Sequence, residues 1–232
     1  MPTPTASKTE NRRIGLFGGT FNPIHNGHLS ACRQVYRHLK LERVYVIPCN
    51  VPPHKDTSQL APGRDRLAMV ELALAADPVM LASDLELQRP GTSFSIDTVL
   101  AVKALAGKPA DLFFILGLDA FLSLHTWQAW RRLPAETAMA VMSRPFDDGS
   151  SKRDLVKQLE TYLHSTVSLR YRYHLQDGCF RHPVLKPVYP VEVSPVDVSS
   201  SHIRQCLRNG LPIGAMVPEA VSAYIRKKGL YR

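Results

Sequence analysis

The chain has 232 residues, of which 44% are hydrophobic and 21% charged, and its formal net charge at pH 7 is +9. These proportions fit a globular protein with a sizeable core and exclude global disorder. No apolar run has the length needed to cross a membrane, and the first residues lack the apolar core of a secretion signal, so we expect neither membrane insertion nor export. The basic surplus favours anionic partners such as nucleotides, phosphorylated metabolites or nucleic acid.

Strand-like and helix-like patterns alternate along the chain after a polar, aperiodic tail at residues 1–11. Short apolar runs predict strands, which we expect at Arg13–Phe17, Arg43–Pro48, Val79–Ala82, Asp111–Leu116, within Leu133–Met142 and at Val188–Val193. Helical spacing of apolar residues predicts helices, which we expect at Gly27–Lys40, Arg64–Ala76, Phe94–Leu105, Lys152–His164, Ser200–Asn209 and Pro218–Lys228.

This alternation indicates βαβ crossovers and a mostly parallel sheet. The continuously apolar run Asp111–Leu116 fits a sheet that is covered on both faces. We therefore predict an α/β fold, Rossmann-like and doubly wound, with helices on both faces of the sheet. The length favours a single domain over 12–232, with a C-terminal helical portion from about 199 to 232. The basic stretch 165–187 receives no assignment and fits either an oligomer contact or a plain loop.

The four cysteines are scattered along the chain and form no CxxC pair. This spacing disfavours a disulfide framework and a Cys-rich zinc site. A reducing cytoplasm is therefore the expected location of the protein.

The most specific feature is the segment 18–28, which reads Gly-Gly-Thr-Phe-Asn-Pro-Ile-His-Asn-Gly-His. It stands where the first predicted strand meets the first predicted helix, at the sheet edge where parallel α/β folds bind ligands. The paired glycines let the backbone approach a phosphate, and the helix start offers unbonded N–H groups and a positive dipole end. His25 and His28 can point to the same side and donate to phosphate oxygens, and bound phosphate would favour their charged forms.

Other interpretations of this segment are weaker. It is not the dinucleotide pattern G-x-G-x-x-G, and it is not a P-loop because no Gly-Lys-Ser/Thr follows. His25, His28 and Cys32 can be pictured as zinc ligands, but the sequence marks no fourth partner. A turn followed by a helix with histidine caps is the purely structural interpretation.

Two further segments place ligand-binding residue types beside the ends of predicted elements. Gly117-Leu118-Asp119 follows the strand at Asp111–Leu116. If the strand order is 3-2-1-4-5, this turn lies beside Gly18-Gly19, and the Asp119 carboxylate can accept hydrogen bonds from ribose hydroxyls or cap the next helix. Ser199–Arg204 places hydroxyls at a helix start with a cation one turn later, which suits either a phosphate site or a plain cap.

His54 and Lys55 lie in a loop stiffened by Pro52 and Pro53. A rigid loop with two potential cations suits a phosphorylated substrate, although a solvated loop would look the same. Trp127 can stack on the aromatic ring of a ligand or belong to the core.

Four segments in this order resemble the nicotinate mononucleotide adenylyltransferases of the H-x-G-H nucleotidylyltransferase superfamily. They are 18–28, Val51-Pro52-Pro53-His54-Lys55, Gly117-Leu118-Asp119 with Trp127, and Ser199-Ser200-Ser201-His202-Ile203-Arg204. The closing sequence VPEAVSAYIRKKGLYR is also typical of that family. Ser93-Phe94-Ser95 resembles its S-Y-T segment but lacks the phenol hydroxyl, and Arg144 matches a basic position.

The resemblance implies the nucleotidylyltransferase fold and transfer of the adenylyl group of ATP to nicotinate mononucleotide in NAD biosynthesis. It implies catalysis by His25, His28 and Arg204, with Mg²⁺ carried by ATP. The implied ATP site consists of Gly18, Gly19, Thr20, Phe21, His25, His28, Gly117, Asp119, Ser199, Ser200, Ser201 and Arg204. The implied acceptor site consists of Asn22, His54, Lys55, Ser95, Trp127 and Arg144.

Three alternatives stay open at this point. Within the same superfamily, the acceptor can be nicotinamide mononucleotide or phosphopantetheine. A non-catalytic basic nucleic-acid-binding protein is the second, although no aromatic–basic RNA-binding motif supports it. The third is a regulatory protein that kept the fold and lost turnover, and the intact segment 18–28 argues against it. We expect ATP and nicotinate mononucleotide as partners, neither nucleic acid nor a membrane, and we leave a homo-oligomer open.

Overall fold

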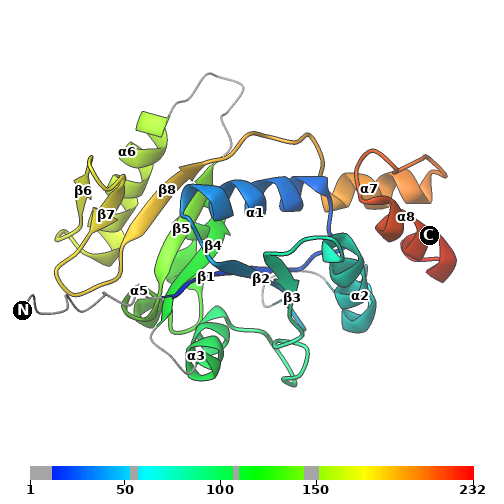
Figure 1. The fold of residues 1–232 in the computed structure, drawn as a ribbon, viewed down its shortest axis with the longest axis horizontal. Helices are drawn as coiled ribbons and strands as arrows, with labels where there is room; N and C mark the ends of the chain where they lie inside the picture. The colour runs from blue at the N-terminus through cyan, green and yellow to red at the C-terminus, as the bar shows by residue number, and fades with distance from the viewer. Residues whose placement is uncertain (1–11, 53–56, 107–109, 144–151) are drawn as a thin grey trace, which may run out of the picture.

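The computed structural model describes residues 12–52, 57–106, 110–143 and 152–232. Within these ranges one eight-stranded sheet has the order β3-β2-β1-β4-β5-β8-β7-β6 (Figure 1). The order begins with the expected 3-2-1-4-5, and the pairs from β3 through to β8 are parallel. The strands are β1 (Arg12–Gly19), β2 (Arg43–Pro48), β3 (Met80–Ala82), β4 (Ala110–Gly117), β5 (Ala138–Ser143), β6 (Arg172–His174), β7 (Cys179–Arg181) and β8 (Val188–Glu192).

Helices connect most of the strands, and two of them close the chain. They are α1 (Asn26–His38), α2 (Gly63–Leu74), α3 (Ser95–Leu105), α4 (Leu118–Leu122), α5 (Leu133–Glu136), α6 (Lys152–Tyr162), α7 (Ser200–Arg208) and α8 (Glu219–Lys228). Short 3-10 turns stand at Leu124–Thr126 and Trp130–Arg132, and a π turn follows α6 at Leu163–Val167.

The sheet separates two hydrophobic cores, because successive strand residues point to opposite faces. In β1, Phe17 belongs to the core that contains residues of α1, α2, α7 and α8. Ile14 and Leu16 belong to the other core, with residues of α3, α4 and α6. Figure 1 shows α1 and α3 on opposite sides of the sheet. The predicted doubly wound α/β fold is confirmed, whereas the single-domain boundary at 12–232 stays a prediction.

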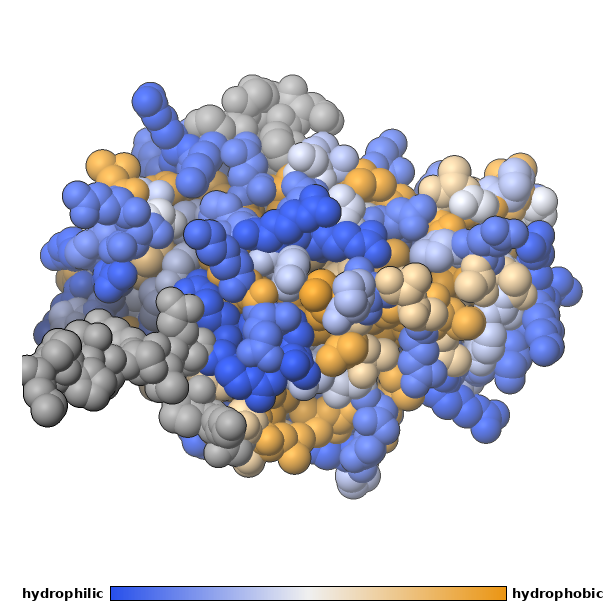
Figure 2. All heavy atoms as spheres, in the orientation of Figure 1, coloured by the Kyte–Doolittle hydropathy of each residue, from blue (hydrophilic) through white to orange (hydrophobic). Residues whose placement is uncertain are grey.

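Helix α1 has one buried stripe, formed by Leu29, Cys32 and Val35. Its outward face carries the exposed Arg33 and Arg37, and Figure 2 shows hydrophilic side chains over this helix. None of the described helices is both long and apolar enough to cross a membrane.

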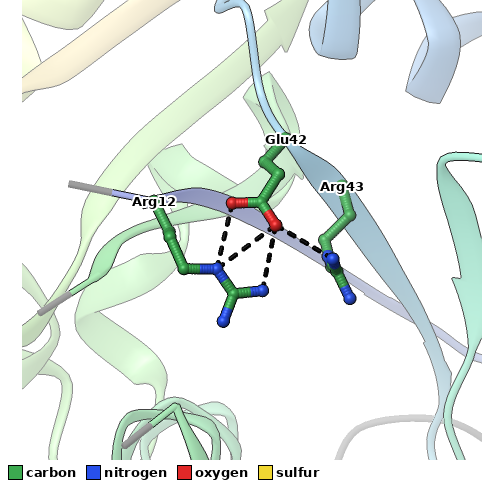
Figure 3. Close-up of polar contacts among 3 residues, drawn as sticks. All are labelled: Arg12, Glu42 and Arg43. Carbon is green, nitrogen blue, oxygen red and sulfur yellow. Dashed lines mark hydrogen bonds and ion pairs between the residues drawn. The ribbon is translucent and has the colours of Figure 1, made fainter. Parts of the chain in front are cut away.

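An exposed ionic cluster joins the first residues of β1 and β2 (Figure 3). Arg12 Nη2 and Arg43 Nη2 donate to Glu42 Oε1 at 3.0 and 2.9 Å. The hydrogen bonds from Arg12 hold the pKa of the Glu42 carboxyl below its usual value. Glu42 N also donates to Arg13 O at 2.7 Å. Because exposed ion pairs add little stability, this cluster contributes little to the free energy of unfolding.

Two parts of the chain differ from the sequence-based expectation. Strand β1 continues through Gly18 and Gly19 and pairs with β2 as far as Pro48, instead of ending at Phe17. The unassigned stretch 165–187 contains the antiparallel strands β6 and β7, which extend the sheet. Strands of three residues are too short to give a periodic signal, and the buried ring of Phe180 anchors this hairpin only through tertiary contacts.

The glycines of β1 yield a test of core packing. A Cβ on Gly15 would lie 2.9 Å from both Leu41 Cδ1 and Val44 Cγ2, whereas a Cβ on Gly18 would meet no atom within 4 Å. We expect Gly15→Ala to lower the free energy of unfolding by about 1–3 kcal/mol, because overpacking displaces core side chains. Gly18→Ala is the matched control and should change it by less than about 0.5 kcal/mol. Urea denaturation measures both, and equal losses would contradict this account.

Candidate active site

The carboxyl ends of β1 and β4, which are paired neighbours, open into a cavity of about 410 Å³. Its lining brings together residues predicted from separate motifs: Gly18, Gly19, Thr20, Gly117, Ser95 and Trp127. A larger hollow of about 990 Å³ lies between α7, α8 and the C-terminal residues, but no predicted site residue lines it. We therefore take the smaller cavity as the candidate site.

His25 and His28 cap the start of α1 reciprocally. His25 is the N-cap residue, and its Nδ1 accepts from His28 N at 3.3 Å, while His28 Nδ1 accepts from His25 N at 3.3 Å. The two rings are stacked, with centroids 3.6 Å apart. This is a capping box in which imidazoles stand where Ser or Thr and Glu or Gln are usual. The histidine-cap interpretation and the expected shared orientation of the rings therefore both hold.

The capping bonds determine the tautomer of both rings. A neutral imidazole that accepts at Nδ1 carries its proton on Nε2, so each Nε2–H is a donor at the helix start. A ring protonated at Nδ1 loses this acceptor, and the geometry therefore corresponds to neutral rings. The expectation that bound phosphate favours their charged forms stays a prediction.

Phe21 supports the His28 ring from the side. It is 2% exposed, and its ring meets that of His28 edge-on at 5.1 Å between centroids. A Cβ on Gly19 would lie 2.9 Å from the Phe21 ring, so glycine is needed for this packing. Phe21 has a φ of +46°, a conformation that non-glycine residues seldom adopt. The strained backbone at Phe21 thus places its ring against the ring of His28.

The Ser199–Arg204 segment lies against the loop of the first motif, although 177 to 182 positions separate the bonded residues. Ser200 Oγ donates to Pro23 O at 2.9 Å, and Arg204 Nη1 donates to Asn22 O at 2.9 Å. Ser199 Oγ accepts from the N–H of residue 202 at 3.1 Å and so caps α7.

The guanidinium of Arg204 is only partly paired with protein groups. Its Nη2 donates to Ser201 Oγ at 3.3 Å, while its buried Nε has no hydrogen-bond partner in the part of the chain that the structure describes. A buried donor without a partner is costly, and an anionic ligand would satisfy it.

Asn22 is buried, and its side-chain amide links three other positions of the chain. Its Nδ2 donates to Gln59 O at 2.9 Å, and its Oδ1 accepts from Ala61 N at 3.0 Å and from Tyr231 Oη at 2.8 Å. Burial raises the pKa of the Tyr231 phenol, so this hydroxyl remains a donor across the neutral range. The predicted contact of Asn22 with the acceptor nucleotide stays a prediction.

Among the remaining predicted residues, Ser95 and Trp127 line the cavity and Asp119 does not. Asp119 is exposed in the first turn of α4, whose N-cap is Gly117, so the alternative interpretation of Asp119 as an N-cap is wrong. Trp127 is half-buried, meets Phe114 edge-on at 6.1 Å and still lines the cavity. Ser95 is the first residue of α3 and lines the same wall. His54, Lys55 and Arg144 lie outside the described residues.

The zinc interpretation of the histidine pair finds no support. Among the residues that the structure describes, no group of three or more His, Cys, Asp and Glu side chains could hold a metal ion. Burial raises the pKa of the Cys32 thiol to about 12, so Cys32 is not a thiolate at neutral pH.

Sequence reasoning missed two buried charged residues near the cavity. Glu86 is 6% exposed, lines the cavity and accepts from Thr98 Oγ1 at 2.7 Å. Arg66 is 1% exposed and bonds to the loops on which the motifs lie. A charged residue at a helix start or in a loop is normally expected to be exposed to solvent. Nothing in the sequence therefore indicates that Glu86 or Arg66 is buried.

Comparison with known proteins gives consistent results. Residues 16–206 match the family model described as cytidylyltransferase-like. A Desulfatibacillum aliphaticivorans protein named probable nicotinate-nucleotide adenylyltransferase is 38% identical over 221 residues, which cover 94% of this chain and 99% of the relative. A Thermus thermophilus protein of the same name is 38% identical over 220 residues, covering 95% and 100%. A solved structure of Plasmodium falciparum nicotinic acid mononucleotide adenylyltransferase complexed with NaAD shares the fold, with a TM-score of 0.69 at 18% identity and coverage of 95% and 98%.

The fold, the capped histidine pair and these matches define a class, and the chain belongs to the cytidylyltransferase-like family of nucleotidyltransferases. Within it, identity over nearly the full length of both chains groups it with the nicotinate-nucleotide adenylyltransferases. The family expected from the four motifs is confirmed.

Two replacements at position 25 separate the cap from the chemistry. We expect His25→Ala to lower the free energy of unfolding by about 1 kcal/mol, because α1 loses its N-cap acceptor. His25→Asn should keep most of that stability, since Asn is a good N-cap, yet it lacks the imidazole Nε2 donor. Thermal and urea unfolding measure the difference. Equal destabilisation by the two variants would show that His25 does not act as a cap.

Proposed function

We propose that the chain transfers the adenylyl group of ATP to nicotinate mononucleotide, releasing pyrophosphate and forming nicotinate adenine dinucleotide, in NAD biosynthesis. The observation that carries this is the stacked pair of His25 and His28 at the start of α1, with Arg204 bonded to the same loop. The names of the relatives support nicotinate mononucleotide as the acceptor.

The reaction is an in-line displacement at the α-phosphorus of ATP. An oxygen of the acceptor's 5′-phosphate forms the new P–O bond, and the bond to the pyrophosphate oxygen breaks. The attacking phosphate is already an anion, so no protein base or covalent nucleophile is required. Catalysis then consists of positioning and of stabilising the charge that develops on the phosphoryl oxygens.

The two imidazoles serve as neutral donors in this proposal. His28 Nε2 donates to the α-phosphate, and His25 Nε2 assists along the triphosphate. The N-terminus of α1 adds its positive dipole end, as helix starts do at phosphate sites. Gly18, Gly19 and Thr20 let the backbone approach the nucleotide closely.

Arg204 binds the leaving pyrophosphate through the Nε donor that lacks a partner among the described residues. The serines 199–201 contribute the backbone N–H groups at the start of α7. The Ser200 hydroxyl already donates to Pro23 O, whereas the Ser199 and Ser201 hydroxyls only accept in their bonds and offer their O–H groups to the phosphates.

The acceptor occupies the half of the cavity lined by Ser95 and Trp127. The indole stacks on the pyridine ring, and the exposed Asp119 accepts from ribose hydroxyls of ATP. His54, Lys55 and Arg144 are proposed as further phosphate contacts from the sequence alone.

Mg²⁺ is part of the substrate in this scheme and neutralises charge on the triphosphate. It commonly keeps water and phosphate oxygens as ligands, so it requires few groups from the protein. The cytoplasmic location stays a prediction.

An acceptor panel tests the proposal directly. Purified protein is mixed with ATP, Mg²⁺ and either nicotinate mononucleotide, nicotinamide mononucleotide or phosphopantetheine, and pyrophosphate release is measured. We expect the highest kcat/KM with nicotinate mononucleotide. A higher value with another acceptor would overturn the assignment of substrate. No release with any acceptor, together with salt-dependent binding to generic DNA or RNA, would instead favour a nucleic-acid-binding protein.

His28→Ala tests the donor to the α-phosphate. We expect kcat to fall by about 10²–10³, which corresponds to about 2.7–4 kcal/mol of transition-state stabilisation for one such donor. The fold should persist, because His25 still caps α1. Steady-state kinetics and thermal unfolding check this, and near-normal turnover with unchanged melting would refute the assignment.

Arg204→Ala should raise KM for ATP more than KM for nicotinate mononucleotide, because the lost donors belong to the pyrophosphate side. Arg208→Ala, on the same helix, is the matched control and should leave both constants nearly unchanged. Initial-rate measurements with each substrate varied in turn give the comparison. A defect confined to the acceptor would show that Arg204 has a different role.

A further inference from the structure

Arg66, in the first turns of α2, is a buried cation bonded only to backbone carbonyls in the described part of the chain. Its Nε donates to Ala61 O at 2.9 Å, its Nη1 to Thr20 O at 2.8 Å and its Nη2 to Asn50 O at 3.0 Å. The residue is 1% exposed. Burying a guanidinium is costly unless its donors are satisfied, so this position is maintained by those three bonds.

The three carbonyls belong to two loops of the candidate site. Thr20 lies in the loop of the first motif and lines the cavity. Asn50 and Ala61 stand near the two ends of the connection between β2 and α2. Asn22 reinforces the same junction through Ala61 N. Arg66 therefore joins the two ends of the β2–α2 connection and bonds them to the loop of the first motif.

Asn50 also bonds to the acceptor wall, which is the side of the cavity lined by Pro52, Ser93 and Ser95. Its Nδ2 donates to Arg89 O at 2.9 Å, and its N donates to Ser93 Oγ at 2.8 Å. Ser93 N donates to the carbonyl of residue 51 at 3.0 Å. Pro52, Ser93 and the adjoining start of α3 line the cavity. A planar guanidinium points its donors in fixed, divergent directions at three carbonyls. The compact ammonium of lysine has three donors but cannot reproduce these directions, and an apolar side chain has no donor.

We propose that Arg66 is a positioning residue for the acceptor nucleotide: it sets the acceptor wall of the cavity at the correct distance from the phosphate-binding loop. This rests on the proposed function, since it names what one buried side chain does for that site. Arg66 touches no reacting atom and acts through Thr20 and Asn50. Arg66 also bonds to Thr20 in the phosphate-binding loop, but that loop has two further supports, the capped start of α1 and Arg204, so removing Arg66 should disturb the acceptor wall more than the ATP side.

Kinetics of Arg66→Ala test this against Arg64→Ala, an exposed arginine of the same helix that serves as control. We expect Arg66→Ala to raise KM for nicotinate mononucleotide about tenfold or more and to lower kcat by about 10²-fold, the effect of a misplacement near 1 Å. KM for ATP should change little. Millimolar guanidinium chloride should restore a substantial part of the lost kcat/KM by occupying the vacated space, whereas equal sodium chloride should not.

Arg66→Lys keeps the charge but not the planar fork, and it decides the matter if the alanine variant fails to fold. We expect it to show the same rise in acceptor KM with a smaller loss of thermal stability than Arg66→Ala, because lysine keeps the charge and part of the hydrogen bonding. Unchanged acceptor KM in a folded Arg66 variant would overturn the proposal. So would equal rises in both KM values that follow the loss of stability and do not respond to guanidinium. If the wild-type protein prefers another acceptor, the proposed function fails, and the Arg66 variants are then judged with that acceptor.

Discussion

The reciprocal capping of α1 by His25 and His28 is the interaction on which the site depends. One pair of hydrogen bonds satisfies two backbone N–H groups at the helix start, fixes both rings against rotation and assigns the proton of each ring to Nε2. The groups that stabilise the helix start are thus the same groups that we propose as donors to a phosphate. Donors fixed before the substrate arrives need no reorganisation during the reaction, which is the condition for effective charge stabilisation.

The loop that delivers these imidazoles is held from parts of the sequence that lie far apart. Arg66 bonds to Thr20 O, Arg204 to Asn22 O and Tyr231, the penultimate residue, to Asn22 Oδ1. Parallel topology makes this possible, because the loops after β1 and β2 and the start of α7 all reach the carboxyl edge of one sheet. The C-terminal segment is therefore part of the support of the site, although none of its residues lines the cavity.

Much of this arrangement could be predicted from sequence, and the limits have physical causes. The parallel, doubly wound sheet followed from the alternation of apolar runs and helices, because continuously apolar strands require helices on both faces. The 3-2-1-4-5 strand order was only assumed as the common case. Segment 18–28 could be recognised as a candidate phosphate-binding segment, because a plain turn and helix cap would not require its glycines and histidines in that order. The burial of Arg66, by contrast, depends on carbonyls contributed by three separate positions, and no local pattern encodes such convergence. The hydrogen bonds of the Asn22 side chain could not be predicted for the same reason, since two of its partners stand 37 and 209 positions away.

The stacked geometry also explains why imidazoles, and not two permanent cations, suit this position. Two unit charges about 4 Å apart repel by about 4 kcal/mol at an effective dielectric constant near 20, and the ring centroids here are 3.6 Å apart. Two lysines at that spacing would cost α1 stability before any nucleotide bound. Neutral rings avoid this repulsion and still present two N–H donors, while the helix dipole and Arg204 supply positive potential from outside the pair.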